Sequence, residues 1–172
     1  MSAAALKAPV DIRQRVFQGT RIASDFGIET AKRIARANSR VGVAAQNWEP
    51  QIAAAAAAIQ ADCSMPDWDG EQAAPVSTEA LALAQRVAAL FYCFVPRDTP
   101  APELLPDADG DVSLSWTRDR ERMFAVSIGN HNKLNYAGRL GGGVEPHDVA
   151  IFNPEDPSAI QQIATYVVRL FK

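Results

Sequence analysis

The sequence predicts an α+β protein with N-terminal helices, one further helix, a three- to four-stranded antiparallel meander and a C-terminal helix. Three observations predict this class. Apolar residues recur at helical spacing before residue 95, alternating strands follow after residue 110, and helical spacing returns after residue 156. Helices and strands that are kept apart along a chain are typical of the α+β class.

Two helices are expected at the N-terminal end of the chain. Apolar or small residues recur at three- and four-residue steps over residues 12–34, with arginines between them, which predicts an amphipathic helix that ends before residues 38–42. A second helix is expected from Asn47 to about Ala61, with Pro50 in its first turn. The alanine run 53–58 favours a helix but offers little volume for packing, so this helix either lies close against another helix or is a spacer.

A third helix is expected from Ser77 to about Phe94. Ser77 can cap its free amides, and Glu79 suits the positive end of the helix dipole. Leucine, valine and phenylalanine side chains cover more than one face of this segment, so it is expected to be the most buried helix. The four prolines within residues 96–106 are expected to exclude regular structure and to hold the following crossing extended.

Alternating apolar and polar residues predict the strands. The pattern covers residues 112–117, 124–129 and 134–137, and residues 149–152 supply the fourth strand if the meander has four. Trp116 is predicted to lie on the buried face, opposite the helix 77–94. Asp156 then caps a last helix, with Pro157 in its first turn and an apolar stripe that extends to Phe171.

The charge of the chain is distributed unevenly. Residues 1–45 carry eight basic and three acidic side chains, a net charge of +5, so the remainder carries −8 when the whole chain carries −3. We therefore predict a basic helical region at residues 1–62 and an α+β module at residues 66–172. Basic segments of this kind bind acidic protein surfaces or nucleic acid, although an arginine-rich solvated helix face is an equal alternative. The predicted binding residues are Arg13, Arg15, Lys32, Arg33 and Arg36.

Composition favours a globular protein of the cytoplasm. Hydrophobic residues make up 48% of the 172 residues, which is enough to bury one core. No apolar stretch approaches the roughly 20 residues that a membrane span needs, and the first ten residues lack the apolar block of a secretory signal. Cys63 and Cys93 are spaced unlike a metal site and are expected to be reduced.

Residues 66–140 contain a Trp-Asp-Gly sequence at residues 68–70, Ala-Pro at residues 74–75, a Pro-Asp-x-Asp-Gly turn at residues 106–110 and a Leu-x-Trp strand that ends at Trp116. In these motifs the segment resembles a widespread group of small uncharacterised bacterial proteins. Glu71 and Gln72 depart from the group, which more often has an aromatic residue and a glycine there. The resemblance implies a shared fold module and no particular activity.

Several motifs contain some of the residue types that a site of chemistry needs. The segment 107–111 has the carboxylates of a calcium loop but lacks its glycine and glutamate at the required positions, so a tight turn explains it better. Asp67 and Asp69 could hold Mg²⁺, yet carboxylates that accept backbone amides in a turn are favoured. Neither His131 nor His147 has a partner at metal or triad spacing, and the glycines of 138–143 lack the residues of a phosphate loop. No catalytic residue, metal or cofactor is therefore assigned.

The leading hypothesis is a non-catalytic bacterial protein-binding factor of the antitoxin, immunity or anti-defence type. It rests on the charge asymmetry and on the lack of a recognisable catalytic motif. One alternative is a nucleic-acid-binding regulator that uses the basic N-terminal helix. A second alternative is a metal-dependent hydrolase built on Asp67, Asp69 and the acidic turn. The expected partner is another protein with an acidic surface.

Overall fold

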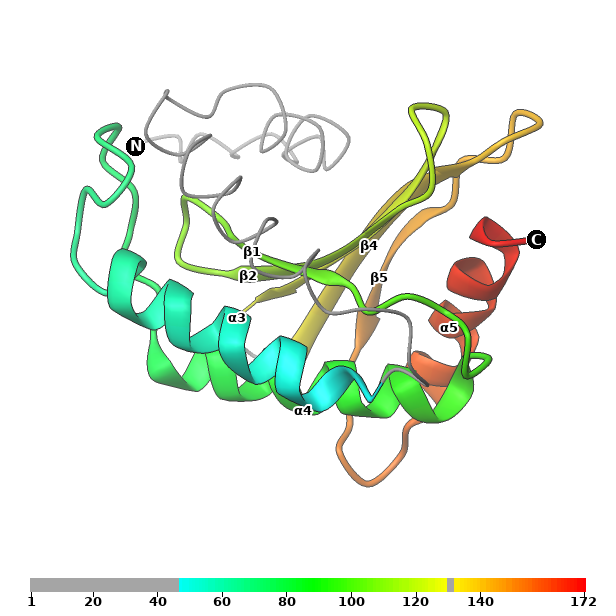
Figure 1. The fold of residues 1–172 in the computed structure, drawn as a ribbon, viewed down its shortest axis with the longest axis horizontal. Helices are drawn as coiled ribbons and strands as arrows, with labels where there is room; N and C mark the ends of the chain where they lie inside the picture. The colour runs from blue at the N-terminus through cyan, green and yellow to red at the C-terminus, as the bar shows by residue number, and fades with distance from the viewer. Residues whose placement is uncertain (1–46, 130–131) are drawn as a thin grey trace, which may run out of the picture.

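The computed structural model describes residues 47–129 and 132–172 (Figure 1). The predicted helix at residues 12–34 and the predicted binding residues Arg13, Arg15, Lys32, Arg33 and Arg36 lie outside these ranges. The described elements, in chain order, are α3 (Trp48–Cys63), α4 (Thr78–Phe94), β1 (Glu103–Pro106), β2 (Val112–Thr117), β3 (Arg122–Gly129), β4 (Lys133–Leu140), β5 (His147–Ile151) and α5 (Ser158–Leu170).

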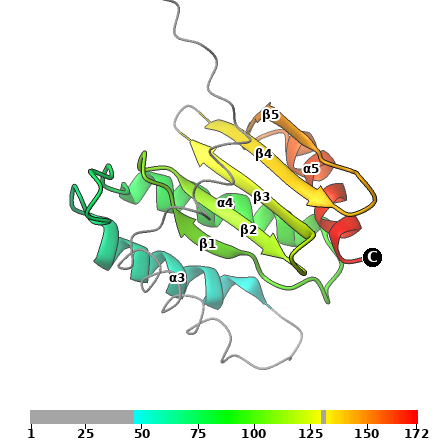
Figure 2. The same cartoon turned by 90° about the horizontal axis from the view of Figure 1, so that it is seen from above.

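The strands form one antiparallel sheet in the order β1-β2-β3-β4-β5. Helices α3, α4 and α5 all lie on the same side of this sheet (Figure 1). In the view from above, α4 and α5 lie behind the strands and α3 lies along the β1 edge (Figure 2). Helices confined to one face of an antiparallel meander confirm the predicted α+β class. The prediction of three to four strands is corrected, because the sheet has five.

Strand β1 is the element that the sequence analysis missed. It occupies Glu103–Pro106, inside the proline-rich crossing that was expected to lack regular structure, and it pairs with β2. Proline cannot donate a ladder hydrogen bond and is tolerated at the ends of edge strands, and β1 is an edge strand with Pro106 as its last residue. Leu104, between the prolines, is fully buried and holds the strand against the core.

Helix α3 begins as expected, because the Asn47 side chain accepts a hydrogen bond from the Glu49 amide at 3.1 Å. The alanine run turns one side to the interior, since Ala55 and Ala56 are buried while Ala53 and Ala54 are exposed. Small side chains let α3 lie against α4, and α3 also packs on β1. The alanine run therefore belongs to a docked helix and not to a spacer.

One hydrophobic core joins α3 to the rest of the described structure. Trp48, Ile52 and Ile59 of α3 belong to the same buried cluster as the apolar side chains of α4, α5 and the sheet. The division between residues 1–62 and 66–172 stays a prediction, but residues 48–63 share the core of the second region.

The cap of α4 follows the sequence expectation, whereas that of α5 departs from it, because the N-cap of α5 is Pro157, which makes no side-chain cap hydrogen bond. The Ser77 hydroxyl accepts a hydrogen bond from the Ala80 amide at 3.0 Å. The Asp156 carboxylate accepts one from the Ser158 amide at 3.1 Å, although the helix begins after Pro157 and not before it. Both bonds satisfy amides that the first helical turn leaves without a carbonyl partner.

Trp116 lies at the centre of an aromatic cluster between the helices and the sheet. It is 1% exposed, which confirms that it lies on the buried face of β2. Its ring centroid lies 5.2 Å from that of Phe91, 6.1 Å from that of Trp48 and 6.4 Å from that of Phe124. Its indole Nε1 has no hydrogen-bond partner among the described residues, so packing alone holds this side chain.

Candidate functional site

The face of the sheet opposite α3, α4 and α5 is the first candidate surface. We call it the open face. The strand register and the alternation of side chains place these residues on it: Glu103, Leu105, Ser113, Ser115, Thr117, Met123, Ala125, Ser127, Asn135, Ala137, Arg139, His147, Val149 and Ile151. Its centre on β2 and β3 carries mostly serine and alanine, whereas its exposed larger apolar side chains, Val149 and Ile151, lie together on β5.

Asp107 anchors the turn between β1 and β2 to two strands. Its Oδ2 atom accepts hydrogen bonds from the Ser113 hydroxyl at 2.6 Å and from the Ser127 hydroxyl at 3.2 Å. Its own amide donates to the Asp111 carbonyl at 2.9 Å, which closes the turn. Gly110 adopts the left-handed backbone conformation, with φ of 85°, that this turn requires. The segment 107–111 is therefore a tight turn, as the sequence analysis favoured.

The carboxylates of the Trp-Asp-Gly segment are also engaged with the backbone. Asp67 accepts a hydrogen bond from the Gln72 amide at 2.7 Å, and Asp69 accepts from the Glu71 amide at 2.8 Å and from the Ala73 amide. This arrangement confirms the favoured interpretation of a local turn. Among the described residues, no group of three or more histidine, cysteine, aspartate or glutamate side chains is placed to hold a metal ion.

The two segments on which the predicted resemblance rests, residues 68–75 and 106–110, lie side by side. The Ala74 amide donates to the Ala108 carbonyl at 2.8 Å, and the Trp68 indole donates to the Ala74 carbonyl at 2.9 Å. A side chain at Gly110 would come within 2.9 Å of the Pro75 carbonyl oxygen, so this approach requires glycine. The motif residues hold the start of α4 beside the β1–β2 turn, which is a structural role.

Burial raises the pKa of Asp107 to about 6, and the charges of Asp109 and Asp111 add to this, against the opposing effect of the two serine hydrogen bonds. A raised carboxyl pKa means that the fold favours the protonated form. The contribution of the protonated Asp107 to the free energy of unfolding is complete below about pH 4 and is lost as the pH rises through about 6. Between pH 4 and pH 8, we expect the free energy of unfolding to fall by about 2 kcal/mol more in the wild-type protein than in Asp107→Asn, whose side chain stays neutral.

Denaturant titration across that pH range measures this difference. Asp98→Asn is the matched control, because it removes the same charge from an exposed position in another loop. Parallel pH profiles for the wild-type protein and Asp107→Asn would contradict the assignment.

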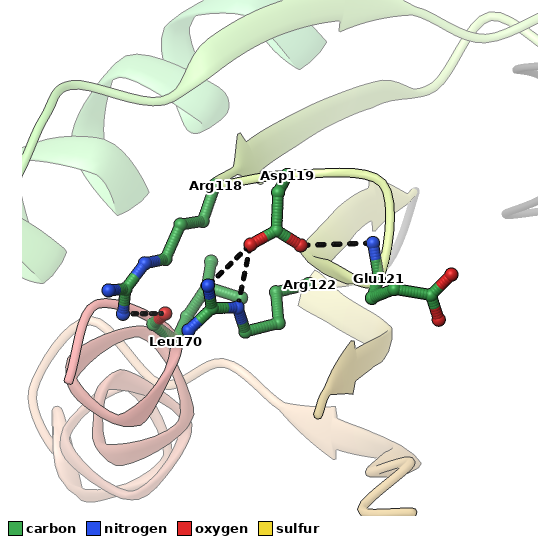
Figure 3. A network of polar contacts seen from close by, with 5 residues as sticks. All are labelled: Arg118, Asp119, Glu121, Arg122 and Leu170. Carbon is green, nitrogen blue, oxygen red and sulfur yellow. Dashed lines mark hydrogen bonds and ion pairs between the residues drawn. The ribbon is translucent and has the colours of Figure 1, made fainter. Parts of the chain in front are cut away.

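A shallow depression of about 700 Å³ lies between the β2–β3 turn and the β4–β5 turn. Arg122 donates to Asp119 in its wall, and this bond holds the pKa of Asp119 below its usual value. Arg118 of the same turn donates to the Leu170 carbonyl at the end of α5 at 3.2 Å (Figure 3). These contacts fix the turn against α5. The lining of the depression has two acidic and two basic side chains, so its charge favours neither an anionic nor a cationic ligand.

Strand β5 is the last strand of the sheet, and no other strand of residues 47–129 and 132–172 pairs with its outer edge. The other edge, β1, has only four residues, ends in Pro106 and is packed by α3. The large apolar side chains exposed in the described part of the chain are Met65, Val149 and Ile151, and the last two lie on β5 at 43% and 62% exposure. Exposed edge strands with apolar side chains are sites of strand pairing with another chain.

The main-chain N–H and C=O groups of successive β5 residues point alternately towards β4 and away from it. The Phe152 amide donates to the Asn132 carbonyl, and the Pro146 carbonyl accepts from the Gly138 amide, so the even-numbered residues point their main-chain groups towards β4. The groups of His147, Val149 and Ile151 therefore point outward. The Asp148 carboxylate accepts the outward amide of Val149 at 2.8 Å.

The sequence analysis did not select Val149 or Ile151. Residues 149–152 are predicted as a short fourth strand, but the sequence does not show which strand lies beside them. The signal that could have identified them is position, because a last strand of a meander that is followed by a helix lies at a sheet edge.

Both cysteines are free thiols, as expected. Cys63 is buried, and this burial, with the charges of Asp62 and Asp69, raises its pKa to about 11, so its thiol is a poor nucleophile. Cys93 is exposed on α4.

Within the described ranges, no helix has the length and apolar character that would let it cross a bilayer. No protein-family model, curated protein or solved structure matches this chain.

Proposed function

We propose that this protein is a protein-binding factor whose recognition element is the outer edge of β5. The supporting observation is that β5 carries two of the three large apolar side chains exposed in the described part of the chain, on a strand whose outer main-chain groups face away from the sheet. An edge of this kind binds an extended segment by main-chain hydrogen bonds, with affinity added by side chains at alternate positions.

The biological class that we propose is the antitoxin, immunity or anti-defence type. Proteins of that class act by occupying a surface of another protein, which needs a rigid recognition element and no catalytic group. The antiparallel ladder that pairs β5 with β4 over five residues gives β5 such a support. The alternative of a metal-dependent hydrolase is not favoured, because the carboxylates of Asp67 and Asp69 accept hydrogen bonds from backbone amides.

Affinity capture with quantitative mass spectrometry tests this proposal. The purified protein is immobilised and exposed to extract of its source organism, and the captured partner is compared between the wild-type protein and the double variant Val149→Lys with Ile151→Lys. We expect the variant to lose the partner by at least about tenfold, since lysine on an edge strand opposes pairing.

Met65→Lys is the matched control, because it removes the remaining exposed large apolar side chain from a position remote from β5 in the sequence. We expect it to retain the partner. Equal capture by all three proteins would contradict the proposal. A captured fraction that nuclease releases from all three proteins would instead favour the nucleic-acid alternative, for which the charge of +5 on residues 1–45 is the supporting observation.

A further inference from the structure

The outer edge of β5 is suited to a second copy of this chain. Its outward main-chain groups belong to His147, Val149 and Ile151, which are arranged symmetrically about Val149. A two-fold axis that passes Val149 would place each of these groups opposite an outward group of the other copy. We infer that two copies pair their β5 strands antiparallel about this axis, which continues the sheet from one protomer into the other. This inference goes beyond the proposed function and shares with it only the accessible outer edge of β5.

The register follows from charge and from the number of groups paired. An axis at Asp148 would place the two Asp148 carboxylates directly opposite each other, and like charges in that position destabilise a sheet. An axis at Ala150 would leave the outward groups of His147 beyond the end of the partner strand. The axis at Val149 pairs all three outward-facing residues and avoids both costs.

The side chains are compatible with this register. On the open face, Val149 faces its own counterpart, and Ile151 faces His147 of the other copy. On the helix-covered face, Asp148 faces Ala150 of the other copy, so no like charges stand directly opposite. Val149 and Ile151, which are exposed in the single chain, would both gain apolar or aromatic neighbours.

Asp148 limits the strength of this pairing. In the single chain its carboxylate accepts a hydrogen bond from the Val149 amide. This bond must break before the amide can donate to the other copy. A strand of five residues also gives an interface smaller than the roughly 1,200 Å² of stable complexes. We therefore expect a reversible dimer whose population depends on protein concentration.

Sedimentation equilibrium of the full chain, over about 1 µM to 1 mM, tests the pairing. We expect Val149→Lys to raise the dimer dissociation constant at least about tenfold, because it sets two lysines opposite each other. Asp148→Ala should lower that constant by freeing the Val149 amide, and Met65→Lys should leave it unchanged. All three positions are exposed, and dichroism checks that each variant is folded. A wild-type monomer at every concentration, or a dimer unaffected by Val149→Lys, would overturn the inference.

Oxidative cross-linking tests the register. In a Cys93→Ser background, Val149→Cys should form a disulfide between the two copies, because the Cα atoms of a directly opposed, hydrogen-bonded pair lie about 5.5 Å apart, within disulfide range. His147→Cys, which faces Ile151 of the other copy, should cross-link at least about tenfold less. Equal cross-linking at both positions would overturn this register.

The two failures can be told apart. If the lysine variants lose the captured partner while the wild-type protein is monomeric, the proposed function stands, and the strand that occupies β5 belongs to that partner. If the dimer depends on Val149 while capture does not depend on β5, the self-pairing stands and the proposed function fails.

Discussion

A fragment of residues 66–172, the predicted α+β module, is expected to lose its cooperative fold when it is produced alone. The fragment lacks α3, and with it Trp48, Ile52 and Ile59, which belong to the common core. Their removal would expose the faces of α4 and β1 on which α3 packs. Each buried side chain of this size contributes about 2–5 kcal/mol, so their joint loss exceeds the stability of most small domains.

Near-UV circular dichroism and denaturant titration measure this outcome. We expect weak aromatic signals and a broad transition from the fragment, as in a molten state. A fragment of residues 47–172 is the control, because it keeps α3 and its Asn47 cap. A sharp transition and a native near-UV spectrum from residues 66–172 would show that the second region has an independent core.

Trp116→Ala is expected to cost about 3–5 kcal/mol of stability, the range for truncating a buried aromatic side chain. Trp116 is 1% exposed and lies between Phe91, Trp48 and Phe124, so alanine would leave a large cavity among rings that cannot all move inward. Urea titration at neutral pH gives this value directly. A cost below about 1 kcal/mol would mean that the aromatic cluster is not the centre of the core.

Trp116→Phe separates packing from hydrogen bonding. The Trp116 indole nitrogen has no partner among the described residues, so phenylalanine removes no hydrogen bond and should cost less than about 2 kcal/mol. Trp48 differs, because its indole donates to the Thr99 carbonyl at 3.1 Å. Trp48→Phe should therefore cost about 1 kcal/mol more than Trp116→Phe. Equal costs would show that the bond to Thr99 contributes nothing to stability.

The local features of this fold could be predicted from sequence because short-range chemistry decides them. Ser77 and Asn47 cap helices through amides within three residues of themselves. The turn at residues 107–111 needs only the geometry of aspartate and glycine. Alternation of apolar residues likewise placed Trp116 on the buried face without knowledge of its partners.

Strand β1 could not be predicted because the contacts that stabilise it come from distant parts of the chain. Four prolines dominate the local pattern, and the residues between them are too few for an alternation to be recognised. Leu104 becomes part of a strand because β2 offers it a ladder and α3 covers it. Tertiary context overrides a local propensity wherever the gain in burial exceeds the local cost.

The α+β class, the order of most elements, the caps of α3 and α4 and the buried position of Trp116 follow from local sequence, since each depends on neighbouring residues or on a simple period. Long-range packing places α3 in the common core, brings Ser113 and Ser127 to Asp107, and leaves β5 as the last strand of the described sheet. These features join residues far apart in the chain. Whether Val149 is covered depends on which strand comes to lie beside it, and no local pattern carries that information.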